Sequence, residues 1–465
     1  MKKLIPALLL CGAFAIAQQH PAIAIRNAKI VTVSGPVIAK GTVVVRNGLI
    51  EAVGDNVQAP ADALVIDGEG LTVYPGLIDS LSTWGQPGAA PTTTTATAGR
   101  GGRGATTTAT PAAAQMAAPT QLARGPEDRP QTTSWLKIAD EISGADRRIE
   151  TARSAGFTTA VTFPTRGIFA GQGAVIDLIS GEKPGEMVVS SPVGQYISLG
   201  RGGFGGGGGG GFPSSLMGYI AYVRQIYLDA DHYKLVKEAY AKDPRGMQRP
   251  DYDRALEGVL DSPRILLPAN RLVEMDRMLR LAAELKQPTI LYGGREAFRA
   301  QAAELLKKYN TPLLLSMKWP EKARDTDPDE VDSIRTLETR DQAASAPAIL
   351  AKAGVRWAFY SDGLDQARDL QRAVKKALDA GLSREDALRA LTLSPAQIFG
   401  VQDRAGSIEK GKIGNLVVTR GDIFDDRTKV EAIIVDGRKY EPAPDASPMG
   451  GRGAVTEPGN PGGIR

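Results

Sequence analysis

Cysteine and histidine are almost absent from this sequence. Its 465 residues include one cysteine, Cys11, and two histidines, His20 and His232. Cys11 lies in an N-terminal segment with the features of a signal peptide, so the processed chain would contain no thiol. This absence excludes disulfide bonds, thiol catalysis and cysteine-based zinc sites from the processed chain. It also excludes a metal site built on three or more imidazole ligands.

A large excess of charge is absent too. The chain has 56 basic and 52 acidic residues, a net charge of +4. A balance so close to neutral gives no electrostatic attraction for nucleic acid or an anionic membrane surface. After the N-terminus no apolar run is long enough to cross a membrane. The 42% apolar fraction is enough for a sizeable core in a chain of this length.

The N-terminus has the three parts of a secretory signal. Lys2 and Lys3 precede an apolar run over residues 4–16, and Ala15-Ile16-Ala17 forms a small-x-small cleavage site. We therefore predict that residues 1–17 are a signal peptide and that the protein is exported to the periplasm or secreted. Leu10 stands before Cys11 where a lipoprotein signal usually has a small residue, which disfavours lipidation.

Both ends of the remaining chain have the pattern of short strands. Residues 22–71 include a run ending in Arg46, then Asn47-Gly48, a strong hairpin-turn signal, and a second run that pairs back. Similar strands recur over residues 405–441. Because neither end has enough strands alone, we predict that they combine into one small β-sandwich.

Between these ends, residues 72–404 alternate strands and helices. Such βα repeats predict a parallel sheet, either doubly wound or closed into a (β/α)₈ barrel. Two low-complexity insertions, residues 85–133 and 201–212, have too few large apolar side chains to pack. We predict that both insertions and the tail over residues 442–465 are flexible.

The stretch from Val73 to Gly85 carries a family resemblance. Its Pro75-Gly76-Leu77-Ile78-Asp79 resembles the first barrel strand of the amidohydrolase superfamily, in an exported, imidazolonepropionase-like form. The superfamily pattern is Pro-Gly-Leu/Phe-Ile/Val-Asp-x-His-x-His. The resemblance implies the barrel rather than the doubly wound sheet, joined to a composite β-sandwich.

The same resemblance implies zinc or another divalent metal, yet the ligand positions lack ligands. Leu81 and Thr83 occupy the two histidine positions after strand one. The placements for strands five and six end in Pro268 and Tyr292, where the superfamily uses histidines. Leucine has no donor atom and a threonine hydroxyl is a poor zinc ligand. We therefore predict no metal cofactor.

Asp362 is the family residue that is retained. The segment Phe359-Tyr360-Ser361-Asp362-Gly363 resembles the strand-eight motif that carries the superfamily's catalytic aspartate. Asp362 could position a water molecule or bind a cationic group. An aspartate at a helix entry can equally be retained for backbone hydrogen bonds. Asp79 is expected to be structural.

The sequence leaves two alternative functions open. The resemblance implies a hydrolase of carbon–nitrogen bonds other than simple peptide bonds. Bound metal lowers the pKa of water from about 15.7 to about 7, which is worth about 12 kcal/mol. Loss of that effect predicts impaired catalysis. The alternative is a non-catalytic relative that binds a small molecule or pairs with an active amidohydrolase subunit, and a homo-oligomer is also open.

Overall fold

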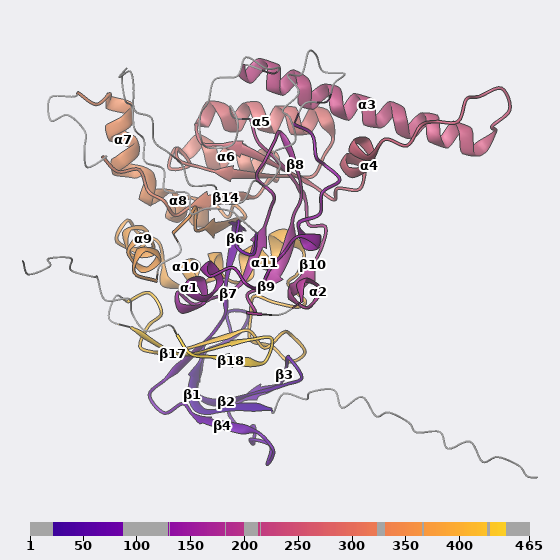
Figure 1. The fold of residues 1–465 in the computed structure, drawn as a ribbon. Helices are drawn as coiled ribbons and strands as arrows, with labels where there is room; N and C mark the ends of the chain where they lie inside the picture. Colours follow the sequence, from indigo (N-terminus) through magenta and orange to yellow (C-terminus); the bar gives the residue numbers. More distant parts are fainter. Residues whose placement is uncertain are drawn as a thin grey trace, which may run out of the picture.

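The computed structural model describes residues 22–86, 129, 131–181, 183–199, 213, 215–322, 331–364, 367–425 and 428–442. The predicted signal peptide, the second insertion, most of the first insertion and residues 443–465 of the tail lie outside these residues. The described chain is a mixed α/β structure with a β-rich part below an α/β part (Figure 1). Within it, no helix combines the length and the apolar character needed to span a membrane.

Among the described residues, α-helices lie between Arg148 and Phe399, whereas strands occur from one end to the other. The strands are β1 (Ile23–Ile30), β2 (Ile38–Arg46), β3 (Leu49–Gly54), β4 (Leu64–Asp67), β5 (Thr72–Pro75), β6 (Leu77–Ser82), β7 (Phe157–Thr162), β8 (Phe169–Gln172), β9 (Ala174–Asp177), β10 (Val188–Ser190), β11 (Gln195–Ile197), β12 (Ile265–Ala269), β13 (Thr289–Gly293), β14 (Leu313–Ser316), β15 (Trp357–Tyr360), β16 (Leu416–Arg420), β17 (Lys429–Val435) and β18 (Arg438–Tyr440). The helices are α1 (Arg148–Ser154), α2 (Pro184–Met187), α3 (Leu216–Lys242), α4 (Arg254–Leu260), α5 (Leu272–Leu285), α6 (Ala300–Lys308), α7 (Ile334–Gln342), α8 (Ala346–Lys352), α9 (Ala367–Asp379), α10 (Arg384–Ala390) and α11 (Leu393–Phe399), with 3₁₀ turns η2 (Ile138–Asp140) and η3 (Ala343–Ser345).

The two chain ends share one sheet. Its strand order is β18-β17-β16-β5-β1-β2-β3, with β4 paired to β1. β16 runs antiparallel to β5, with Leu416 opposite Pro75. Asn47 and Gly48, both at positive φ, turn β2 into β3 and confirm the predicted hairpin. Residues from either side of the α/β part therefore meet in one hydrogen-bonded network.

The α/β part contains two sheets with the orders β10-β9-β7-β6 and β15-β14-β13-β12-β11-β8. β6 and β7 are parallel, as are the neighbours from β11 to β15. β9 runs antiparallel to β7, and β8 runs antiparallel to β11, with only Gly173 between β8 and β9. The last residues of the predicted first insertion lie against β8, where Thr133 N donates to Phe169 O at 2.8 Å.

The outer edges of these two sheets touch. Ser80 Oγ of β6 donates to the carbonyl oxygen of Phe359 in β15 at 2.6 Å. Ser361 N, just after β15, donates to Asp79 Oδ1 of β6 at 2.9 Å. β6 and β15, which are far apart in the sequence, therefore lie side by side.

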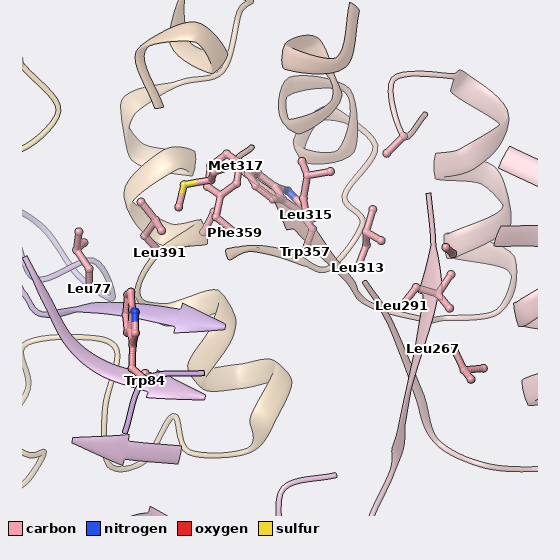
Figure 2. Packing of buried hydrophobic residues seen from close by; sticks show 14 of the residues in the cluster. Leu77, Trp84, Leu267, Leu291, Leu313, Leu315, Met317, Trp357, Phe359 and Leu391 are labelled. Carbon is pink, nitrogen blue, oxygen red and sulfur yellow. The ribbon is translucent and has the colours of Figure 1, made fainter. Parts of the chain in front are cut away.

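Side chains alternate between two apolar layers along the parallel strands. Figure 2 shows one of these layers, which includes Leu267, Leu291, Leu313, Trp357 and Phe359. Their sequence neighbours point the other way into a second buried cluster, which we call the inner cluster. It takes its members from strands of both sheets and from α11, among them Ile78, Val161, Tyr196, Leu266, Ile290, Leu314, Ala358 and Phe399. Because both faces of the strands are buried, the strands are apolar almost throughout.

Candidate functional site

The candidate site lies at the carboxyl ends of β6, β12, β13, β14 and β15. In the strand register, Pro268 lies beside Tyr292 and Ser316 lies beside Tyr360. The side chains at these strand ends therefore lie along the same edge of the sheet. We call the set the strand-end site; it consists of Leu81, Pro268, Tyr292, Ser316, Tyr360 and Asp362, together with Tyr196 of β11, whose ring stacks on Tyr292. Ligand sites of parallel α/β folds occur at this edge.

Asp362 is held by its neighbour on β14. Its Oδ2 accepts a 2.8 Å hydrogen bond from Ser316 Oγ, and Ser316 Oγ in turn accepts from Lys318 N at 3.1 Å. Ser316 Oγ therefore links the backbone after β14 to the carboxylate after β15. Asp362 has φ of +51° and is partly exposed. A left-handed, non-glycine backbone costs energy and is retained only where its surroundings enforce it.

Asp79 lies behind Asp362 and has a different environment. It is fully buried, and its carboxylate accepts hydrogen bonds from Ser361 N, Ser361 Oγ and Leu81 N. Burial raises the pKa of Asp79 to about 7, and the negative charge of Asp362 contributes in the same direction. Asp79 is therefore a structural carboxyl that joins β6 to the end of β15.

Leu81 and Thr83 offer no metal ligand. Leu81 packs against the inner cluster. Thr83 is engaged by Arg148, whose Nη1 donates to Thr83 Oγ1 at 3.0 Å and whose Nη2 donates to Thr83 O at 2.8 Å. Asp146 holds that guanidinium with an Nη2–Oδ2 distance of 2.7 Å. A cation already contacts the hydroxyl that would have to face a metal.

The residues at the ends of β12 and β13 are also unsuited to bind a metal. Pro268 has no donor atom. Tyr292 donates its hydroxyl to Ile197 O at 3.1 Å, and its ring stacks on Tyr196 with centroids 5.1 Å apart. Burial raises the pKa of Tyr196, Tyr292 and Tyr360, so all three phenols stay protonated at neutral pH.

This donor set does not fit zinc. Across the residues that the structure describes, no group of three or more histidine, cysteine, aspartate and glutamate side chains could hold a metal ion. His232 lies on an exposed part of α3, away from the strand ends. Asp362 is the one carboxylate of the strand-end site, and one carboxylate is too few for a zinc site.

Two cations flank the strand-end site. Arg295 follows β13 by two residues and Lys318 follows β14 by two, as Asp362 follows β15. Both side chains are exposed, and the charge of Arg295 acts on the Tyr360 phenol. The edge therefore presents one carboxylate, several hydroxyls and two cations.

Sequence patterns picked out Asp362, Leu81 and Thr83 but missed Ser316, Tyr360 and Arg148. The hydroxyl of Ser316 follows the apolar run Leu313-Leu314-Leu315, so a polar residue at a strand end was an available signal. The contact between Arg148 and Thr83 joins residues 65 apart and had no signal of its own.

Comparisons with known proteins agree with the fold. Residues 262–440 match the model of the amidohydrolase family. An amidohydrolase from Thermotoga maritima has 25% sequence identity and a TM-score of 0.68, and the match covers 90% of this chain and 100% of that one. Residues 262–440 of this chain are therefore similar to the amidohydrolase family, and the described fold is similar to that of a solved amidohydrolase.

Two further solved structures share the fold at lower identity. A prolidase complexed with N-methylphosphonate-L-proline has 16% identity and a TM-score of 0.51, with 90% of this chain and 100% of that chain covered. Molinate hydrolase has 15% identity and a TM-score of 0.50, with 91% and 95% covered. No curated protein sequence matches the chain. The family match begins at residue 262 and so leaves out Leu81 of β6 and Thr83, which follows that strand.

Proposed function

We propose that this protein is a member of the amidohydrolase superfamily that binds a small molecule at the strand-end site and does not carry out metal-dependent hydrolysis. The proposal includes a closed (β/α)₈ barrel and a β-sandwich composed of both chain ends. Contacts between β6 and β15, and the bridging position of β8 and β9, support closure. We also propose that residues 1–17 are a signal peptide that directs export, and that the protein is of the imidazolonepropionase-like subtype.

The observation that carries the proposal is the bonding of the side chains at the ligand positions. Leu81 and Pro268 have no donor atom, Thr83 is held by Arg148, and Tyr292 is held by Ile197 O. A carboxylate alone cannot replace metal activation of water, an effect of about 12 kcal/mol. Binding therefore fits this site better than hydrolysis.

The side chains of the strand-end site indicate how a ligand would be held. Asp362 accepts hydrogen bonds or pairs with a cationic group, and Arg295 and Lys318 attract an anionic group. The phenol ring of Tyr292, which is partly exposed, supplies apolar surface. A small polar molecule that carries both a donor and an anionic group matches this arrangement.

The hydrogen bond from Ser316 Oγ to Asp362 Oδ2 favours a second candidate function. An aspartate oriented by a hydroxyl at the mouth of the site could act as a general base toward water in hydrolysis of a carbon–nitrogen bond. A non-catalytic subunit that pairs with an active amidohydrolase is a third arrangement, and it predicts a histidine-containing homologue as the partner.

The deciding experiment measures metal content and turnover on the same purified protein. We expect no stoichiometric zinc, and no turnover of N-acyl amino acids, cyclic amides or small peptides. Asp362→Ala should weaken binding of ligands found by thermal-shift screening, with Asp261→Ala as an exposed control on the opposite strand ends. Stoichiometric zinc, together with turnover that Asp362→Ala abolishes, would overturn the proposal in favour of the hydrolase.

Restoring the two missing histidines should not restore a metal site. In Leu81→His/Thr83→His, Arg148 still lies against position 83, and Pro268 and Tyr292 still occupy the other ligand positions. We expect zinc content after dialysis to equal that of the unmodified protein. Bound zinc at one equivalent would show that these two positions alone decide metal binding.

A further inference from the structure

The carboxylate of Asp362 lacks a positively charged partner. Among the residues that the structure describes, its side chain accepts a hydrogen bond from the neutral hydroxyl of Ser316 and forms no ion pair. The buried carboxylate of Glu296, which lies close by in the sequence of β13 and α6, is paired with Arg335 at 2.6 Å. The partly exposed Asp362 can therefore take its cation from a ligand.

A second carboxyl group lies behind Asp362 and does not supply a counter-charge. Asp79 accepts hydrogen bonds from Ser361 N, Ser361 Oγ and Leu81 N, which are neutral donors. Burial raises the pKa of Asp79, and the negative charge of Asp362 raises it further. Two carboxyl groups that repel each other in this way favour the binding of a cation between them and the solvent.

The two cations that flank the strand-end site do not fill this role. Arg295 and Lys318 both have exposed side chains. Because an exposed side chain keeps its water and its rotamer freedom, it gains little from a surface ion pair. These two residues therefore lie at the outside of the site and leave the carboxylate of Asp362 open.

Aromatic rings lie next to this carboxylate. Tyr292 stacks on Tyr196 with ring centroids 5.1 Å apart, and part of Tyr292 remains exposed. Burial raises the pKa of the phenols of Tyr196 and Tyr360, and the charge of Asp362 raises both further, which is the effect of a nearby carboxylate. A carboxylate beside aromatic rings suits an organic cation, because ring faces attract positive charge and contact the carbon atoms around it.

We propose that the strand-end site selects an organic ammonium ion. Its N–H groups bind the carboxylate of Asp362, and the carbon atoms next to its nitrogen lie on the ring of Tyr292. A metal ion would find one carboxylate and one hydroxyl there, too few oxygen ligands for calcium or magnesium. The inference rests on the proposed function, binding of a small molecule at this site, and names the chemical class of that molecule.

Three probes of similar shape and different charge test the proposal. Benzylammonium, benzyl alcohol and benzoate share one ring and differ in the polar group. Isothermal titration calorimetry should show that benzylammonium binds roughly tenfold more tightly than benzyl alcohol, because hydrogen bonds to charged groups are the stronger ones. Added salt should weaken the binding of benzylammonium and leave that of benzyl alcohol unchanged.

The variant Asp362→Asn assigns this preference to the carboxylate. Asparagine has the same shape, tolerates a positive φ and can still accept from Ser316, so the variant should fold. It should lose the preference for benzylammonium and bind benzyl alcohol as before. Asp261→Asn, which removes an exposed carboxylate at the opposite strand ends, is the matched control and should keep the preference.

The outcomes separate this inference from the proposed function. Tighter binding of benzoate, equal binding of the three probes, binding of none, or an unchanged preference in Asp362→Asn would overturn the assignment of an ammonium ligand. Binding of benzoate alone would still leave the site a small-molecule site. Stoichiometric zinc with turnover would instead overturn the proposed function on which the inference rests.

Discussion

At the residue scale, Asp79 and Asp177 are two buried aspartates with raised pKa values. Asp79 ties β6 to β15, and Asp177 accepts hydrogen bonds from Thr159 Oγ1 and Asn415 Nδ2. Burial raises the pKa of each to about 7. Both therefore hold a proton in the folded protein under mildly acidic conditions where an unfolded aspartate has lost it.

Asp79→Asn should flatten the pH dependence of stability. A raised folded-state pKa contributes stability that is complete below the unfolded value near 4 and lost as pH rises through about 7. For Asp79 the resulting decrease in the free energy of unfolding, from below pH 4 to above pH 7, is about 4 kcal/mol. Asparagine cannot ionise, and its oxygen can still accept from Ser361 N and Leu81 N. Urea unfolding measured across this pH range should show a smaller slope for the variant.

Asp177→Asn serves as a comparison for this measurement, because it removes a second buried aspartate with a raised pKa. Each single variant should remove part of the slope, and the double variant should remove more. A slope in Asp79→Asn identical to that of the unmodified protein would show that Asp79 is ionised in the folded state.

At the element scale, the Pro75-Gly76 pair lets β5 turn into β6 against β7. A Cβ at position 76 would lie 1.9 Å from Thr158 Oγ1, and Thr158 is fully buried. Gly76→Ala should therefore lower the free energy of unfolding by about 3 kcal/mol or prevent folding. Gly70→Ala is the control: no atom lies within 4 Å of its Cβ, although its φ of +74° should cost about 1 kcal/mol. Equal losses in denaturant unfolding would contradict this account.

Helix α7 is held by ion pairs rather than by apolar packing. None of its residues is buried, and Ile334 is 86% exposed. The buried carboxylate of Glu296 accepts from Arg335 at 2.6 and 2.8 Å, and Arg299 pairs with Glu338 at 2.6 Å. Its attachment should therefore depend on charge and on salt.

Glu296→Gln should release α7 without unfolding the sheets. We expect faster amide hydrogen exchange over residues 334–342 and unchanged exchange in β13 and β14. Raised salt should accelerate exchange of the same helix in the unmodified protein. Glu304→Gln, an exposed change on α6, should leave exchange as it was. Unchanged exchange in α7 for Glu296→Gln would mean that other contacts hold the helix.

At the scale of the whole molecule, Asn415 joins the sheet of the chain ends to the α/β part. Its Nδ2 donates to Asp177 Oδ1 at 2.7 Å and to Thr159 Oγ1 at 3.0 Å, and its Oδ1 accepts from Asp436 N at 2.8 Å. Asn415→Ala leaves buried partners unsatisfied and should cost about 3 kcal/mol. Denaturant unfolding followed by tryptophan fluorescence and by far-UV circular dichroism measures this loss. Asn56→Ala, at an exposed position, should change stability by less than about 0.5 kcal/mol.

Much of the strand and helix pattern was predictable because it depends on local properties. Asn47-Gly48 specifies a hairpin turn through its backbone preference, and the apolar runs of β12 to β15 mark strands buried on both faces. The strand pattern at each end, together with the family resemblance, predicted that the two ends combine, whereas the specific pairing of β16 with β5 was not predicted. The antiparallel course of β8 and β9 was not predicted, since Gly173 between them has no local signal for pairing direction.

The sequence by itself determined that histidine ligands are missing, because two histidines cannot supply the superfamily's set wherever the chain places them. It also determined that Leu81 has no donor atom. Only the tertiary structure decided what the remaining polar groups do. Arg148 meets Thr83, Ser316 holds Asp362, and Ser361 donates to Asp79, and each contact joins separate elements. The chemistry of a side chain is a local property, whereas its hydrogen-bond partner depends on how distant strands pack. The family resemblance therefore located the site, and the fold determined which hydrogen bonds its side chains make.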